Sequence, residues 1–125
     1  MSWDAYITNL LATNYVTEGV ILGHNGSVWA ASPGLKIQPA EITALIAGFK
    51  ENSPLHATGV HINGVKYFTL RANDNEVLAK KGPTGIACYK TTQAIVIGFH
   101  PESVQPGQCT TEVAKVADYL REQGY

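Results

Sequence analysis

Residues 94–99 read Ala-Ile-Val-Ile-Gly-Phe, a run without a single polar side chain. A β-strand points successive side chains to opposite faces of its sheet, so a run like this one requires both faces to be covered. The run is far too short to span a membrane, which takes about 20 apolar residues. This segment therefore predicts a strand buried between two layers, and the rest of the chain must supply helices for both faces.

The other predicted strands are short and are separated by turn signals. Residues 60–62 and 65–72 flank Asn63-Gly64, a pair that tolerates the positive φ angles of a tight hairpin turn. Residues 19–23 and 27–32 are predicted to pair across a turn at 24–26, and residues 76–81 and 86–90 are two further strands. Because hairpins link most of these segments, the sheet is predicted to be mostly antiparallel.

Three segments show helical spacing of apolar residues. The first follows Ser2 as a predicted cap, and its apolar stripe consists of Trp3, Tyr6, Ile7, Leu10 and Leu11. The second opens at Pro39, and the third follows Pro106-Gly107 with Thr110 or Thr111 as its predicted cap. We expect one α+β domain over residues 1–125, with the N- and C-terminal helices on one face of the sheet and a further helix or helices on the other.

Charge is small overall but unevenly spread. The chain has a net charge of −1, yet residues 66–90 carry five basic residues against Asp74 and Glu76. This is too little charge for a dedicated nucleic-acid-binding protein. It is enough for one basic surface that meets an acidic partner, and the alternative is a solvated basic edge without a partner.

The sequence shows no catalytic constellation. Cys88 and Cys109 are not in a CxxC pair, and the four histidines have no metal-ligand spacing. "KKGPTG" lacks the order of a phosphate-binding loop and is not followed by a predicted helix. The N-terminus lacks the basic leader of a signal peptide. We expect a non-enzymatic cytoplasmic protein with reduced thiols and without a metal or other cofactor.

Aromatic residues at both ends raise the question of a binding groove. With about 100° per residue, Tyr6 and Tyr119 each lie roughly 100° from the buried direction of their helices. If the two helices pack side by side, these flanks meet in one groove, and Trp29 can form its floor. Grooves of this kind bind proline-rich segments, which are extended before they bind. The alternative is that the aromatic residues belong to the core and expose only their polar tips.

Several motifs in order resemble the profilin family over essentially the whole chain. They are "SWDAYITNLL", "SVWAASPG", "AKKGPTG", "QAIVIGFHPESVQPGQC" and "DYLREQGY", and they are closer to plant and protist members than to animal ones. The resemblance implies a monomeric protein of the cytoskeleton that binds proline-rich segments between its terminal helices. The positions that match that groove are Trp3, Tyr6, Asn9, Trp29, Tyr119, Leu120 and Tyr125.

The resemblance also implies binding of monomeric actin and of phosphatidylinositol 4,5-bisphosphate. The positions that match the actin surface are Lys66, Arg71, Lys80, Lys81, Lys90, Gly107, Thr111 and Lys115. Lys80, Lys81 and Lys90 are the expected phosphoinositide residues. Lys66 and Arg71 are an odd number of residues apart, so either a bulge intervenes or one of them lies at a strand end.

The implied function is delivery of actin to proline-rich proteins such as actin-filament nucleators, with promotion of nucleotide exchange on actin as a further expectation. The alternative is a signalling adaptor that binds phosphoinositides and proline-rich ligands but has little affinity for actin. A small-molecule-binding or enzymatic domain on a similar scaffold is a third reading, since fold does not fix function.

Overall fold

A computed structural model describes residues 3–32, 35, 37–51 and 53–125, so the predicted cap Ser2 lies outside the described residues. The elements in chain order are α1 (Trp3–Ala12), β1 (Glu18–Gly23), β2 (Val28–Ala31), α2 (Pro39–Ala47), α3 (Leu55–Thr58), β3 (Val60–Ile62), β4 (Val65–Ala72), β5 (Glu76–Lys81), β6 (Thr84–Lys90), β7 (Ala94–His100) and α4 (Pro106–Glu122).

The described strands form one seven-stranded sheet in the order β2-β1-β7-β6-β5-β4-β3, and every pair in it is antiparallel. β7 lies inside the sheet between β1 and β6, and all of its residues are buried. This confirms the prediction from residues 94–99. The α+β class and the antiparallel sheet are confirmed as well.

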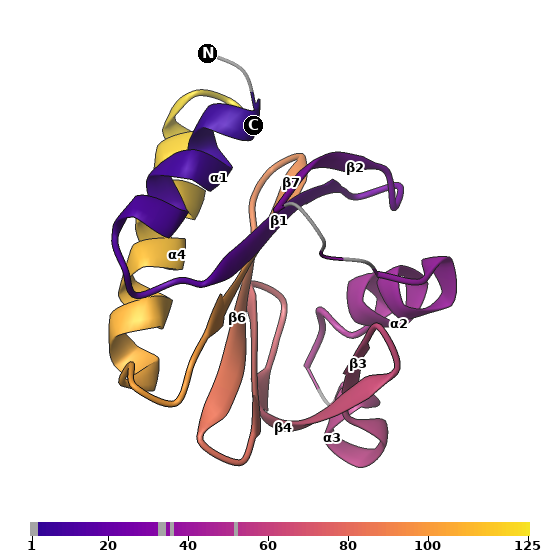
Figure 1. Ribbon diagram of the computed structural model, residues 1–125. Helices are drawn as coiled ribbons and strands as arrows, with labels where there is room; N and C mark the ends of the chain where they lie inside the picture. Colours follow the sequence, from indigo (N-terminus) through magenta and orange to yellow (C-terminus); the bar gives the residue numbers. More distant parts are fainter. Residues whose placement is uncertain (1–2, 33–34, 36, 52) are drawn as a thin grey trace.

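The two faces of the sheet carry separate hydrophobic clusters. Ile95, Ile97 and Phe99 of β7 pack on the face covered by α2 and α3, while Ala94 and Val96 pack on the face covered by α1 and α4. Figure 1 shows α1 and α4 side by side on one side of the sheet and α2 and α3 on the other, with the start of α1 close to the C-terminal end of the chain. We call these the α2/α3 face and the α1/α4 face.

Helix α4 lies very close to the sheet at Gly98 of β7. A Cβ atom at Gly98 would lie 2.4 Å from Cγ2 of Val113 and 3.3 Å from Cγ1 of Val16. Real carbon contacts never come as close as the first distance, so only glycine lets α4 pack at this depth. This contact fixes the helix that carries Tyr119.

Helix α4 begins earlier than predicted. Pro106 is its first residue, and the main-chain N–H of Gln105 donates to Oε1 of Gln108 at 3.1 Å. The prediction of Thr110 or Thr111 as the cap is therefore wrong. Both threonines lie within the first turns and donate to carbonyl oxygens four residues back. Proline is favoured at the first helical position because that residue needs no N–H donor.

The sequence analysis did not single out α3, and it placed the start of β6 too late. α3 has four residues, which is too short to show a periodic apolar pattern. β6 begins at Thr84, two residues before the predicted start, because the β5–β6 hairpin keeps pairing up to Lys81 and Thr84.

Glu41 joins the start of α2 to the tip of the β3–β4 hairpin. Asn63 and Gly64 have φ angles of 49° and 77°, as the tight turn requires. Their main-chain N–H groups donate to the two oxygens of the Glu41 carboxylate, each at 2.7 Å, and the N–H of Gln38 donates to it at 2.9 Å. Partial burial raises the pKa of Glu41, but these three donors outweigh it and hold the pKa below its usual value.

The Glu41→Gln variant is expected to unfold more easily than the native chain at neutral pH, by about 1–2 kcal/mol after allowance for solvent exposure. The folded-state pKa is lowered, so the contribution is complete above the unfolded value of about 4.5 and is lost as the pH falls through the lower folded value. Denaturant titrations at pH 7 and pH 3 check this. Glu51→Gln, at an exposed position beyond α2, is the matched control. An equal loss at both pH values would contradict it.

Candidate functional site: an aromatic groove and a basic sheet surface

Five aromatic side chains from four parts of the chain meet beside the terminal helices. The ring of Trp3 lies 4.6 Å from that of Trp29, 5.6 Å from that of Tyr6 and 5.0 Å from that of Tyr125, measured between centroids. Tyr6 continues the row to Tyr119 at 5.9 Å. We call these five residues the aromatic groove. The packing of α1 against α4 that was assumed from the sequence is confirmed.

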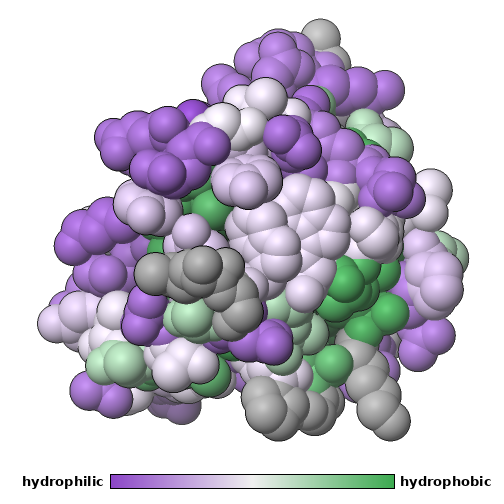
Figure 2. All heavy atoms as spheres, turned by 90° about the horizontal axis from the view of Figure 1, so that it is seen from above, coloured by the Kyte–Doolittle hydropathy of each residue, from purple (hydrophilic) through white to green (hydrophobic). Residues whose placement is uncertain are grey.

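The groove is open to solvent. Tyr119 and Tyr125 are 43% and 41% exposed, and Trp3, Tyr6 and Trp29 are half-buried against the core cluster of the α1/α4 face. Figure 2, which views the molecule from above, shows a pale area of near-neutral hydropathy between hydrophobic and hydrophilic residues. Aromatic rings with one face packed and one face in solvent are typical of ligand-binding grooves. Tyr119 and Tyr125 are therefore not core residues, whereas Trp3, Tyr6 and Trp29 pack partly against the core.

Tyr6 of the groove keeps its proton at neutral pH. Burial raises the pKa of Tyr6, and the nearby hydroxyls of Tyr119 and Tyr125 raise it further. A neutral phenol donates a hydrogen bond, and the carbonyl groups of an extended peptide accept one. The groove thus combines flat apolar faces with hydrogen-bond donors.

The last residues turn back over the end of α4. Gly124 has a φ angle of 89°, and the N–H of Tyr125 donates to the carbonyl of Leu120 at 2.8 Å. This left-handed turn brings Tyr125 beside Trp3. The side chain of Leu120 is fully buried, so it supports the groove from below and does not line it.

A hollow of about 360 Å³ continues the groove along α1 and α4. Its lining residues are Tyr6, Asn9, Lys115, Val116 and Tyr119. This places Asn9 where the resemblance expected it. It also places Lys115, which was expected on the actin surface, at the groove, together with Val116, which sequence reasoning missed. Val116 lies three residues after Val113 and four before Leu120. This helical spacing indicates a core residue and not one that lines a ligand surface.

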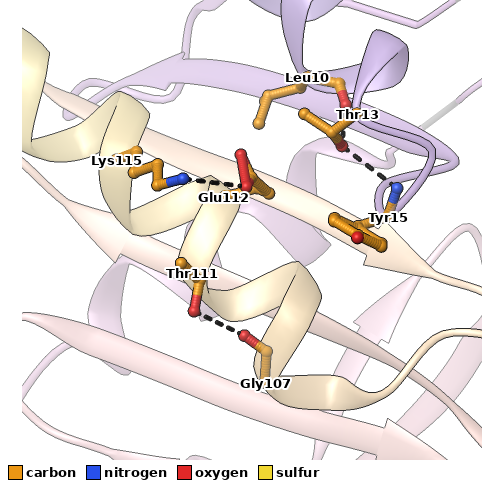
Figure 3. A network of polar contacts seen from close by, with 7 residues as sticks. All are labelled: Leu10, Thr13, Tyr15, Gly107, Thr111, Glu112 and Lys115. Carbon is orange, nitrogen blue, oxygen red and sulfur yellow. Dashed lines mark hydrogen bonds and ion pairs between the residues drawn. The ribbon is translucent and has the colours of Figure 1, made fainter.

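Lys115 forms an ion pair with Glu112. Its Nζ lies 3.2 Å from Oε1 of Glu112, whose side chain is only 19% exposed. Figure 3 shows the side chains of Glu112 and Lys115 in contact on α4. The side chain of Thr111 points toward Gly107 instead. The charge of Lys115 is therefore partly neutralised within the protein.

A β-bulge decides where the basic residues of β4 lie. The β4–β5 register passes from Thr69 paired with Ala79 to Arg71 paired with Leu78, so Leu70 is an extra residue. Tyr67 and Ala72 both pack on the α2/α3 face. Their neighbours Lys66 and Arg71 consequently share the opposite face. Of the two alternatives left open for their odd spacing, the bulge is the correct one.

An exposed surface on β4 and β5 combines charge with large apolar side chains. Alternation along β5 puts Lys80 on the same face as Lys66 and Arg71, because its neighbour Ala79 packs on the α2/α3 face. Phe68 and Leu70 are 62% and 56% exposed. We call these five residues the β4–β5 surface. Sequence reasoning selected its cations and missed Phe68 and Leu70, although their alternation with Tyr67 and Thr69 was a signal.

Two of these basic side chains contact neighbouring side chains of the protein. Arg71 forms an ion pair with Glu76, Nη1 to Oε1 at 3.0 Å, and Lys66 holds its Nζ 5.4 Å from the centroid of the Phe68 ring. Within the described residues, Lys80 has no ion pair.

The structure does not gather all the expected basic residues. Strand alternation turns Lys81 away from Lys80 and places Lys90 on the side of Cys88, which packs on the α2/α3 face. Lys90 also lies at the far end of β6, five residues from Gly85, or about 17 Å at strand rise. Lys80, Lys81 and Lys90 therefore do not form one cluster.

A second hollow, of about 340 Å³, connects the β4–β5 surface to the start of α4. Leu70 and Lys80 line one side of it, and Pro106 and Thr110 line the other. Gly107 and Thr111 are exposed just beyond, on the first turns of the helix. Lys80 of β5 and the first turn of α4 thus border one hollow.

The described residues contain no cluster of three or more potential metal ligands, and none of their helices is long and apolar enough to cross a membrane. Cys88 and Cys109 are free and fully buried. Burial raises the pKa of both thiols, that of Cys109 to about 12. A thiol in this state is a poor nucleophile.

An open aromatic groove and a separate basic and apolar sheet surface on a chain of this size are typical of a small binding protein. The sequence profile named Profilin matches residues 1–125. The chain is 43% identical over 126 residues to profilin-A of Physarum polycephalum, with all of both chains covered. The solved structure of Acanthamoeba castellanii profilin IB, 42% identical, superposes with a TM-score of 0.95 over 99% of this chain and 100% of that one.

The chain belongs to the profilin family, whose members bind actin monomers and poly-proline and are not enzymes. The resemblance to protist members is confirmed. The same fold occurs in mouse profilin IIa, solved in complex with a double repeat from the FH1 domain of mDia1, at 23% identity and a TM-score of 0.84 over 100% of both chains.

Proposed function

We propose that this profilin holds a proline-rich segment in its aromatic groove while the β4–β5 surface and the start of α4 hold an actin monomer. The observation that supports this most strongly is the row of five rings, joined by centroid distances of 4.6 to 5.9 Å and open along one side. An arrangement with two separate surfaces allows both ligands to bind at once. The protein would thereby deliver actin to proline-rich, filament-building partners.

The groove suits proline-rich ligands for physical reasons. Such segments are extended before binding and lose little conformational entropy. Trp3 and Trp29 offer flat faces, and the phenols of Tyr6 and Tyr119 can donate to ligand carbonyls. Asn9 and the hollow beside it extend this surface along α1.

Titration with a proline decamer under tryptophan fluorescence tests the groove. Trp3 and Trp29 are the two tryptophans of the chain, and both belong to the groove. A saturable change is expected, and it should need a much higher peptide concentration in Tyr6→Ala and Tyr125→Ala variants that still melt cooperatively. No change up to millimolar peptide would refute the proposal.

The actin side of the proposal is supported by charge and shape. Lys66, Arg71 and Lys80 surround exposed Phe68 and Leu70, the kind of mixed apolar and cationic surface that binds an acidic protein. The family is one of actin-binding proteins. Acceleration of nucleotide exchange on actin would be a mechanical effect of binding, because the family supplies no catalysis.

Phosphoinositide binding is the remaining family expectation. Lys80 and Lys81 flank the tip of the β5–β6 hairpin, and either can reach an anionic membrane, but Lys90 lies too far away to join them. A few lysines at a membrane surface contribute about 1 kcal/mol each. Vesicles with and without phosphatidylinositol 4,5-bisphosphate distinguish the proposed actin-binding protein from an adaptor that depends mainly on lipid. The adaptor would bind these vesicles tightly and actin hardly at all.

A further inference from the structure

We propose that Thr91 is a positioning residue for the aromatic groove and acts through Tyr125. The inference rests on the proposed binding of proline-rich ligands to that groove. Thr91 lies in the turn between β6 and β7, is only 5% exposed, and belongs to none of the expected binding positions. Its hydroxyl connects this turn to the residue that packs against Trp3.

The geometry of the hydroxyl is specific. Oγ1 of Thr91 accepts a hydrogen bond from the N–H of Ala94 at 2.9 Å. Its own proton has two possible acceptors, the main-chain oxygen of Tyr125 at 2.8 Å and that of Ala94 at 3.2 Å. The shorter contact is the one to Tyr125. A buried hydroxyl with both roles filled holds its partners in one arrangement.

The same turn makes further contacts with the C-terminal segment. The main-chain N–H of Gln93 also donates to the oxygen of Tyr125, and its Nε2 donates to the carbonyl of Gly124 at 3.0 Å. Nη2 of Arg121 donates to the carbonyl of Lys90 at 2.6 Å. The turn therefore holds the end of α4 and the segment beyond it at several points.

This attachment matters because Tyr125 lies beyond the last helix. A segment in that position frays unless it is tied down. Its ring nevertheless meets Trp3 edge-on, at 5.0 Å and an interplanar angle of 83°. A ring held in place before the ligand arrives spares the ligand the cost of ordering it, which raises affinity without a new contact.

The test compares three substitutions in this turn. Thr91→Val removes the hydroxyl at nearly constant volume and is expected to weaken binding of a proline decamer about threefold to tenfold, the loss expected from one hydrogen bond. Thr91→Ser keeps the hydroxyl and should retain native affinity. Thr92→Val makes the same change at the neighbouring exposed threonine, whose side chain has no hydrogen bond among the described residues, and should have no effect. Equal affinity in Thr91→Val and the native chain would overturn the inference.

A double variant separates positioning from general damage. In a Tyr125→Ala background, Thr91→Val should cause no further loss of affinity, because it acts through the side chain that is already absent. The same loss in both backgrounds would mean that Thr91 is only structural and would overturn the inference. Affinity for actin should stay native in both.

If Thr91→Val does not fold, Gln93→Ala tests the same attachment from an exposed position, with an expected loss of about twofold. Native affinity in that variant would then overturn the inference. The native chain distinguishes the two levels of proposal. If it does not bind the decamer, the proposed groove function is wrong. If it binds and the variants match it, only the role of Thr91 is wrong.

Discussion

Replacing Trp3 by alanine is expected to weaken binding of a proline decamer by about thirtyfold or more. Trp3 lies at the centre of the groove, within 5.6 Å of the rings of Trp29, Tyr6 and Tyr125. Central aromatic residues at an interface typically contribute about 2 kcal/mol or more, which corresponds to that factor. The substitution also removes the ring that holds its neighbours in place. Fluorescence of Trp29, the remaining tryptophan, follows the titration.

Two exposed tyrosines provide a matched comparison for this prediction. Tyr119 in the groove is 43% exposed, and Tyr15 in the loop after α1 is 38% exposed. Tyr119→Ala should weaken decamer binding several-fold, and Tyr15→Ala should leave it unchanged. All variants are compared by thermal melting, so that a loss of folding is recognised. Equal losses in the Tyr119 and Tyr15 variants would show that the groove is not the ligand site.

Reversing two charges on the β4–β5 surface is expected to weaken binding of monomeric actin by about tenfold or more. Lys66 and Lys80 are suited to this test because, within the described residues, neither forms an ion pair, whereas Arg71 is paired with Glu76. A Lys66→Glu, Lys80→Glu double variant replaces attraction to an acidic partner by repulsion. The effect should shrink at high salt, because ions screen exposed charges.

Lys50→Glu is the control for that experiment. Lys50 is exposed just beyond α2, away from the β4–β5 surface, and the substitution changes the charge in the same direction. It should leave affinity for actin within about twofold of the native value, as remote exposed charges contribute little. The double variant should still bind the proline decamer. A double variant with native affinity for actin would contradict the assignment of this surface.

These predictions treat the two surfaces as independent, and the structure gives a reason for that. The aromatic groove is built from α1, α4 and β2, while the β4–β5 surface lies at the other part of the sheet, three strands from β1. Lys115 is the residue whose assignment the structure changes most, since it lies at the groove beside Asn9. Its contribution to actin binding stays a prediction.

The sequence by itself determined the layers of this protein. An unbroken apolar strand can only lie between two covered faces, and residues 94–99 required that without any knowledge of the partners. Asn63-Gly64 determined a hairpin, because the positive φ angles are a property of those two residues. Helical periodicity likewise determined the buried faces of α1 and α4 and left Tyr6 and Tyr119 on their flanks. Each of these features depends on residues close together in the chain, so a short sequence pattern is enough to predict it.

Only the tertiary structure decided which residues share a surface. The bulge at Leu70 brought Lys66 and Arg71 to one face, and alternation sent Lys81 and Lys90 to the other. The hydrogen bond from the Thr91 hydroxyl to Tyr125 joins residues 34 positions apart, and its acceptor is a main-chain oxygen, which no sequence pattern identifies. Register and long-range hydrogen bonds depend on how strands and helices meet, and a one-residue shift reverses a face. The groove and the basic surface are both products of that register.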